Sequence, residues 1–101
     1  MIGIDITRIS RFEKMQNLEQ FIKRFRVDGN TALAAAKTWA CLEAVYKAEG
    51  GNATSDQIQV LFPKNSAPKI VDVNHTLKYN YTITLSHEDD LVVAVAFGIK
   101  E

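Results

Sequence analysis

Residues 31–48 read TALAAAKTWACLEAVYKA, and this stretch contains neither glycine nor proline. Alanine, leucine, lysine and glutamate dominate it, and these residues have high helix propensity. The segment Asp28–Thr31 supplies turn and N-cap residues before it, and Gly50 with Gly51 supplies a left-handed C-terminal cap after it. The sequence therefore predicts a helix over residues 31–48, and its other elements are arranged around this one.

The segment before this helix predicts one strand and two short helices. Residues 2–6 (IGIDI) alternate, so that the isoleucines point to one face of a strand while Gly3 and Asp5 point to the other. Asp5 should then lie opposite the apolar face, beside a glycine that leaves room for close approach. We expect a first helix to begin near Arg8 and a second one to follow Asn17.

The segment after the helix predicts strands only. Residues 58–62 and 69–73 are two of them, with a proline-bounded connection between them. Residues 81–86 alternate between apolar and hydroxyl side chains, and residues 91–99 form a long apolar strand whose positions 94, 96 and 98 are small. The order of a strand, helices and then mostly antiparallel strands predicts an α+β fold, with residues 1–101 as a single domain.

Composition excludes several classes of protein. The chain has 101 residues with 12 basic and 12 acidic side chains, and this balance argues against non-specific nucleic-acid binding. No apolar run approaches the roughly 18 residues that a membrane span needs, and the single cysteine, Cys41, allows no internal disulfide, so we expect a cytoplasmic protein without a membrane partner. Such a small domain has a thin core, which favours association with copies of itself.

Asp5 stands where aspartate is uncommon, because it lies inside an otherwise apolar strand. One interpretation is a helix N-cap, with Asp5 or Thr7 capping the helix that begins near Arg8. The other is a ligand for a cation. Position alone leaves both interpretations open.

Glu43 lies in the middle of the 31–48 helix and shares one face with Trp39 and Lys47, four residues to either side. An exposed Glu–Lys pair, which stabilises a helix by about 0.2–0.5 kcal/mol, explains this spacing. However, alanines at positions 40, 44 and 48 flank the face and would let another element or a ligand approach closely. The face is therefore also a candidate site.

If the helix packs against the first strand, Asp5 and Glu43 converge on one cation. Two carboxylates with water and substrate oxygens suit Mg²⁺, which favours phosphate ligands. Lys47 would supply a positive charge to a phosphate, and Gly50-Gly51-Asn52 would offer backbone amides to an anion, although helix capping explains the glycines equally well. The basic residues between positions 8 and 26 form either a solvated helical face or a surface for an acidic partner.

Three segments together resemble the holo-acyl-carrier-protein synthase family, the small phosphopantetheinyl transferases. Gly3-Ile4-Asp5-Ile6 with Arg11 is similar to the opening strand of the family and its helix arginine. Trp39–Ala48 (WACLEAVYKA) is similar to the helix Trp/Phe-Ala-x-Lys-Glu-Ala-x-x-Lys-Ala, and Leu85-Ser86-His87 with Asp90 is similar to the closing Ser-x-Ser-His segment. The segments occur in the order of the family, and the middle motif is the most specific.

The resemblance implies a transfer of 4′-phosphopantetheine from coenzyme A to a serine of apo-acyl-carrier protein, in support of fatty acid biosynthesis. It implies that Asp5 and Glu43 bind Mg²⁺ with the coenzyme A diphosphate and that Lys47 holds a phosphate, these three being the catalytic set. The base that takes the serine proton is either Glu43 or a metal-bound water.

The resemblance also assigns residues to the two substrates. The coenzyme A contacts would be Lys47, Gly50, Gly51, Pro68 and His87, the last at the nucleotide end. The acidic helix of the carrier protein would face Arg11, and we assign Lys14 and Arg24 of the same basic segment to it. The family forms trimers with active sites between subunits.

The sequence departs from the family at three places. Leu42 stands where the family has the lysine before the glutamate, residues 27–37 lack the usual Thr-x-x-Glu segment, and Pro68 alone remains of a Gly-Lys-Pro turn. These departures support an alternative, a degenerate relative that binds a carrier protein or nucleotide without catalysis. A third hypothesis is an unrelated α+β interaction domain in which Asp5 caps a helix and Glu43 pairs with Lys47.

Overall fold

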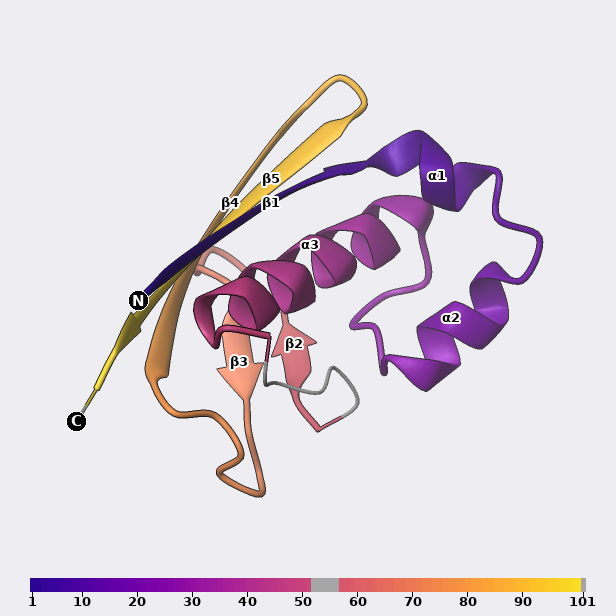
Figure 1. The fold of residues 1–101 in the computed structure, drawn as a ribbon. Coiled ribbons are helices and arrows are strands. Elements are labelled where there is room, and N and C mark those ends of the chain that lie inside the picture. Colours follow the sequence, from indigo (N-terminus) through magenta and orange to yellow (C-terminus); the bar gives the residue numbers. More distant parts are fainter. Residues whose placement is uncertain (52–56, 101) are drawn as a thin grey trace.

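The long helix α3 (Ala32–Ala48) lies across one face of a three-stranded antiparallel sheet in the computed structural model, which describes residues 1–51 and 57–100 (Figure 1). The strand order is β1 (Ile2–Arg8), β5 (Leu91–Ile99) and β4 (Asn80–Glu88), so the last strand lies in the centre. The strands β2 (Gln59–Leu61) and β3 (Lys69–Val71) form a separate antiparallel pair. The predicted α+β architecture is confirmed.

The ends of α3 follow the predicted signals. The Thr31 hydroxyl oxygen accepts a hydrogen bond from the Ala34 amide at 3.1 Å, which satisfies one of the free amides of the first turn. At the other end Gly50 and Gly51 have φ values of 72° and 81°, and the Gly51 amide donates to the Tyr46 carbonyl at 2.9 Å. The predicted left-handed cap is confirmed.

Two short helices, α1 (Ile9–Glu13) and α2 (Leu18–Arg24), connect β1 to α3. The predicted cap of α1 by Asp5 or Thr7 is wrong, because the strand continues through both residues to Arg8. Asp90 of the β4–β5 turn takes this role instead. Its carboxylate accepts hydrogen bonds from the Ser10 amide at 2.8 Å and the Ser10 hydroxyl at 2.7 Å.

The two faces of β1 meet different surroundings. Gly3 packs directly on the backbone of α3, where a Cβ atom would lie 1.8 Å from the Ala44 carbonyl oxygen. Small residues of β5 also face the helix, since Ala94 and Ala96 are fully buried. The isoleucine face of β1 points away from α3 and is exposed in the single chain, with side chains 52–62% accessible. The predicted close approach beside Gly3 is thus made by α3 itself.

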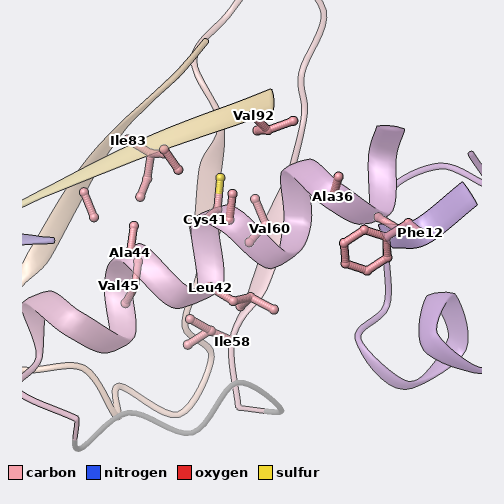
Figure 2. Packing of buried hydrophobic residues seen from close by; sticks show 14 residues of the cluster. Phe12, Ala36, Cys41, Leu42, Ala44, Val45, Ile58, Val60, Ile83 and Val92 are labelled. Carbon is pink, nitrogen blue, oxygen red and sulfur yellow. The ribbon is translucent and has the colours of Figure 1, made fainter. Parts of the chain in front are cut away.

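The core lies between α3, the inner face of the sheet and the smaller strand pair (Figure 2). Its largest fully buried side chains are Phe12, Ile58, Ile83, Val45, Val60, Val92, Thr38 and Cys41. Burial raises the pKa of the Cys41 thiol to about 12, so this cysteine is an inert core residue. None of the described helices is long and apolar enough to cross a membrane.

Strands β2 and β3 are shorter than the predicted 58–62 and 69–73, and a carboxylate forms hydrogen bonds beyond the end of each strand. The Phe62 amide donates to the Asp28 carboxylate at 2.8 Å, just beyond the end of β2. The Asp72 carboxylate accepts from the amides of Thr76 and Leu77, and this turn follows β3 directly. Asp28 thus binds the Phe62 amide from a distant part of the chain, whereas Asp72 closes a local turn.

Candidate functional site

Asp5 and Lys47 meet where β1 crosses the last turns of α3. The Asp5 Oδ1 atom lies 3.1 Å from the Lys47 Nζ atom, and the side chain of Asp5 is only 12% exposed. Lys47 also donates to the Ile4 carbonyl at 3.1 Å. The second carboxylate oxygen, Oδ2, accepts a hydrogen bond from the Thr7 hydroxyl at 2.6 Å. Asp5 is therefore held from two sides, with its charge directed at the helix.

Glu43 lies one turn before Lys47 on α3 and is half-buried. The hypothesis of a surface Glu43–Lys47 pair is wrong, because the ion pair of Lys47 is with Asp5. Among the described residues, Glu43 itself makes no hydrogen bond or ion pair. Its carboxylate thus stays available on the face of the helix that Lys47 shares.

Small residues make this arrangement possible. Gly3 lets β1 approach the backbone of Ala44 and Ala48, which alternate with Glu43 and Lys47 along the helix. Because residues 3 and 5 share one face of a strand, the close contact at Gly3 also directs Asp5 toward α3. The sequence pattern of glycine, aspartate and spaced alanines therefore has one cause, the seam between β1 and α3.

The chemistry of these donors fits a divalent cation such as Mg²⁺. Asp5 already attracts one cation, the Lys47 ammonium, and Glu43 adds a second carboxylate on the neighbouring turn. Within residues 1–51 and 57–100, no three His, Cys, Asp or Glu side chains gather as a complete cage. A cation held by Asp5 and Glu43 would complete its shell with water and substrate oxygens, as Mg²⁺ commonly does.

Gly50 and Gly51 form the turn that ends α3, and both of their amides are used by it. The Gly50 amide donates to the Lys47 carbonyl at 3.1 Å and the Gly51 amide to the Tyr46 carbonyl. The prediction that these two amides are offered to an anion is therefore wrong, since helix capping takes them both. Asn52, the third residue of that prediction, lies outside the described residues.

Pro68 and His87 lie in two separate places. Pro68 lines a cavity of about 360 Å³ between the β2–β3 turn, Lys37 and Leu85. His87 lies near the β4–β5 turn and lines a different hollow of about 280 Å³ with Leu91. Within one chain these hollows share no lining residue, and neither includes Asp5 or Lys47.

The predicted partner-binding residues are exposed on α1 and α2 and just beyond α1. The Arg11 guanidinium stacks on two aromatic rings, 5.3 Å from the centre of Trp39 and 5.5 Å from that of Phe12. Arg24 lies 5.4 Å over the Phe25 ring, whereas Lys14 caps the end of α1 through its backbone. Stacking holds a guanidinium in place while leaving its donors toward solvent.

Two residues of the site were missed in the sequence. Thr7 donates to Asp5, and its position two residues along the same strand was a usable signal, since such residues share a face. Glu49 is buried at the end of α3, although a charged residue before two glycines usually lies in solvent. No local pattern distinguishes it, because its partners lie 29 and 32 residues away.

Comparison with known proteins agrees with the resemblance. Residues 1–96 match the 4′-phosphopantetheinyl transferase superfamily. The chain is 32% identical to the holo-[acyl-carrier-protein] synthase of Mycoplasma mobile, over 100% of this chain and 89% of that protein. It is 28% identical to the enzyme of the same name from Caldicellulosiruptor saccharolyticus, over 99% and 96% of the two lengths.

The fold is also similar to a crystal structure of Helicobacter pylori holo-[acyl-carrier-protein] synthase in complex with coenzyme A. The TM-score is 0.83 and the identity 23%, and the match covers 98% of this chain and 100% of the other. The sequence matches exclude an unrelated interaction domain. From the sequence match over nearly its whole length, the chain belongs to the 4′-phosphopantetheinyl transferase superfamily.

Proposed function

We propose that this protein transfers the 4′-phosphopantetheine group of coenzyme A to a serine of apo-acyl-carrier protein, in the cytoplasm and in support of fatty acid biosynthesis. The relatives that match it over most of their length carry the name of this activity. The single observation that carries the proposal is the contact of Asp5 with Lys47 at 3.1 Å, beside Glu43 on the same helix face. This contact joins two segments of the family pattern in space.

Asp5 and Glu43 would hold Mg²⁺ with the coenzyme A diphosphate. When bound there, the cation would neutralise charge on the diphosphate and so lower the barrier to attack by a nucleophile. An ionised carboxylate offers only acceptor oxygens, and Asp5 already has one cationic partner, the Lys47 ammonium at 3.1 Å. The residues present thus suit a hard cation with oxygen ligands.

Side chains of this protein assist the exchange of bonds at the β-phosphorus of coenzyme A. The carrier serine oxygen forms a bond to the β-phosphorus while the bond from that phosphorus to the bridging diphosphate oxygen breaks, and 3′,5′-ADP leaves. The serine proton passes to a base, for which Glu43 is the candidate on this chain, because its carboxylate has no described partner. Lys47 stabilises the negative charge that builds on the leaving nucleotide.

Carrier recognition rests on the exposed basic residues of α1 and α2. Arg11 and Arg24 are both stacked on aromatic rings, so their guanidinium groups lose little freedom when they pair with carboxylates. Lys14 lies three residues after Arg11 in the sequence and is exposed. An acidic helix of the carrier protein provides the complementary charge.

A homotrimer with sites between subunits accounts for two features of the single chain. The outer face of the sheet is bare in Figure 1 and carries a row of exposed apolar side chains. The most exposed members are Ile2, Ile4, Ile6, Leu91, Phe97 and Ile99. Moreover, Pro68 and His87 lie in hollows apart from Asp5, so a neighbouring copy would bring them to a shared cofactor.

The test is to incubate the protein with apo-acyl-carrier protein, coenzyme A and Mg²⁺ and to weigh the carrier by mass spectrometry. We expect the carrier to gain one phosphopantetheine group, and chelation of the metal to stop the gain. An unmodified carrier at high enzyme concentration would refute the transfer. Retained carrier binding in that case would identify the alternative, a non-catalytic relative, which the burial of Leu42 in the core favours.

Glu43→Gln tests the metal site. We expect this variant to keep its fold and to lose the metal-dependent turnover, because the amide is a poor ligand for Mg²⁺ and no base. Glu19→Gln on α2 is the matched control, with turnover unchanged. Normal turnover by Glu43→Gln would show that the metal assignment is wrong.

A further inference from the structure

Glu49 is the first residue after α3, and it is buried, with only 4% of its surface exposed. A glutamate is seldom buried unless it has partners that offset the loss of water. It takes no part in the proposed reaction, and nothing in the sequence marks it. Its burial therefore calls for a separate explanation.

The partners of Glu49 lie just before β4 and near its start. Both of its carboxylate oxygens accept from the Lys78 amide, at 3.1 and 3.0 Å. Its Oε2 atom also accepts from the Tyr81 hydroxyl at 2.7 Å. Burial, the hydrogen bond to Glu49 and the charge of Glu49 all raise the pKa of Tyr81, which keeps the phenol protonated as a donor.

These bonds fix the end of α3 from the side opposite to the metal site. Lys47 ties the helix to β1 through the Ile4 carbonyl and Asp5. Glu49 follows two residues later, about 200° further around the helix axis, and ties the helix to Tyr81 of β4 and to Lys78 just before it. Because β1 and β4 are the two edges of the sheet, with β5 between them, the helix end is anchored to both edges.

We propose that Glu49 is a positioning residue for coenzyme A binding, which rests on the function proposed above. It acts through Lys47 and the Gly50–Gly51 turn, which adjoin it in the chain. With the β4 anchor intact, the Lys47 ammonium and the turn occupy one position relative to Asp5. Without it, the helix end loses its hydrogen bonds to Lys78 and Tyr81, and part of the coenzyme A binding energy is used to order it again.

The test compares Glu49→Gln with Tyr81→Phe by steady-state kinetics and by calorimetry of coenzyme A binding. Glutamine keeps the shape but retains one acceptor oxygen and adds a donor facing the Lys78 amide. We expect the KM and Kd for coenzyme A to rise about 10-fold in Glu49→Gln. In Tyr81→Phe both should rise about 2- to 3-fold, since the Lys78 bonds remain. The kcat and the KM for the carrier should stay within about 2-fold of wild type.

A purely structural role gives a different result. It lowers the melting temperature and the active fraction, but leaves the KM and Kd for coenzyme A unchanged, and that outcome overturns the proposal. If Glu49→Gln does not fold, Tyr81→Phe decides, because an unchanged Kd in that variant also overturns it. A wild-type protein that binds no coenzyme A would refute the proposed function itself, whereas normal binding by wild type and both variants would refute only the positioning role.

Discussion

Gly3→Ala is the most direct test of the seam that forms the site. The added Cβ atom would lie 1.8 Å from the Ala44 carbonyl oxygen and 2.7 Å from the Ala48 amide nitrogen, whereas ordinary contacts begin at 3.4 Å. The strand must therefore move about 1.6 Å away from α3. Because both atoms belong to the backbone of the central helix, neither can turn aside.

The expected cost is about 3 kcal/mol, the upper end for an overpacked core, which lowers the melting temperature by about 12–24 °C in a domain of this size. Gly51→Ala is the matched control. Its Cβ atom would meet Tyr46 at 3.4 Å, so only the strain of a positive φ is expected, about 1 kcal/mol or 4–8 °C. Thermal unfolding followed by circular dichroism measures both. A melting temperature of Gly3→Ala that equals or exceeds that of Gly51→Ala would refute the reasoning.

Three further predictions concern single contacts. Thr7→Val removes the hydroxyl that donates to Asp5, so turnover should fall about fivefold and the Mg²⁺ concentration needed for half-maximal activity should rise. The control Thr7→Ser keeps the hydroxyl and should stay near wild type. Equal activity of wild type, Thr7→Val and Thr7→Ser would contradict this prediction. Hydrogen bonds from Ser10 hold the pKa of Asp90 below its ordinary value, so its stabilisation is present above about pH 4 and is lost as pH falls through the lowered pKa. The difference in melting temperature between wild type and Asp90→Asn should thus narrow in acid, and a difference constant from pH 7 to 3 would exclude the effect. If copies of the chain cover the outer sheet face, the melting temperature of wild type should rise with protein concentration, and that of Ile4→Lys should not. Light scattering reports the mass of each protein. A wild-type melting temperature that does not depend on concentration would argue against the trimer.

The main elements could be predicted because their signals are local. The helix α3 begins one residue after its predicted start, since Thr31 is a cap, and ends where Gly50 and Gly51 permit the left-handed turn. The strand β5 has its predicted bounds, because nine consecutive apolar or small residues lie between polar ends. By contrast, β2 and β3 were predicted too long. Their ends depend on carboxylates that lie outside the strands.

The site was predictable only in part. The spacing of Glu43 and Lys47 shows that they share a helix face, but not that Lys47 pairs with Asp5, 42 residues away. That contact depends on how closely β1 approaches α3, and Gly3 was the one hint of it. The role of Glu49 depends on the position of β4. Such long-range contacts follow from the packed fold and leave no periodic trace in the sequence.

The central position of β5 has a consequence for how the chain acquires its structure on the ribosome. Strand β1 is synthesised before the other described strands, yet its only partner among them is β5. Ile2, for example, pairs with Phe97. Helix α3 can form as soon as it is synthesised, but neither edge strand of the sheet can pair until residues 91–99 appear. Folding of the sheet must therefore follow synthesis of its last strand. Until then the apolar β1 has no native partner strand and can form non-native contacts.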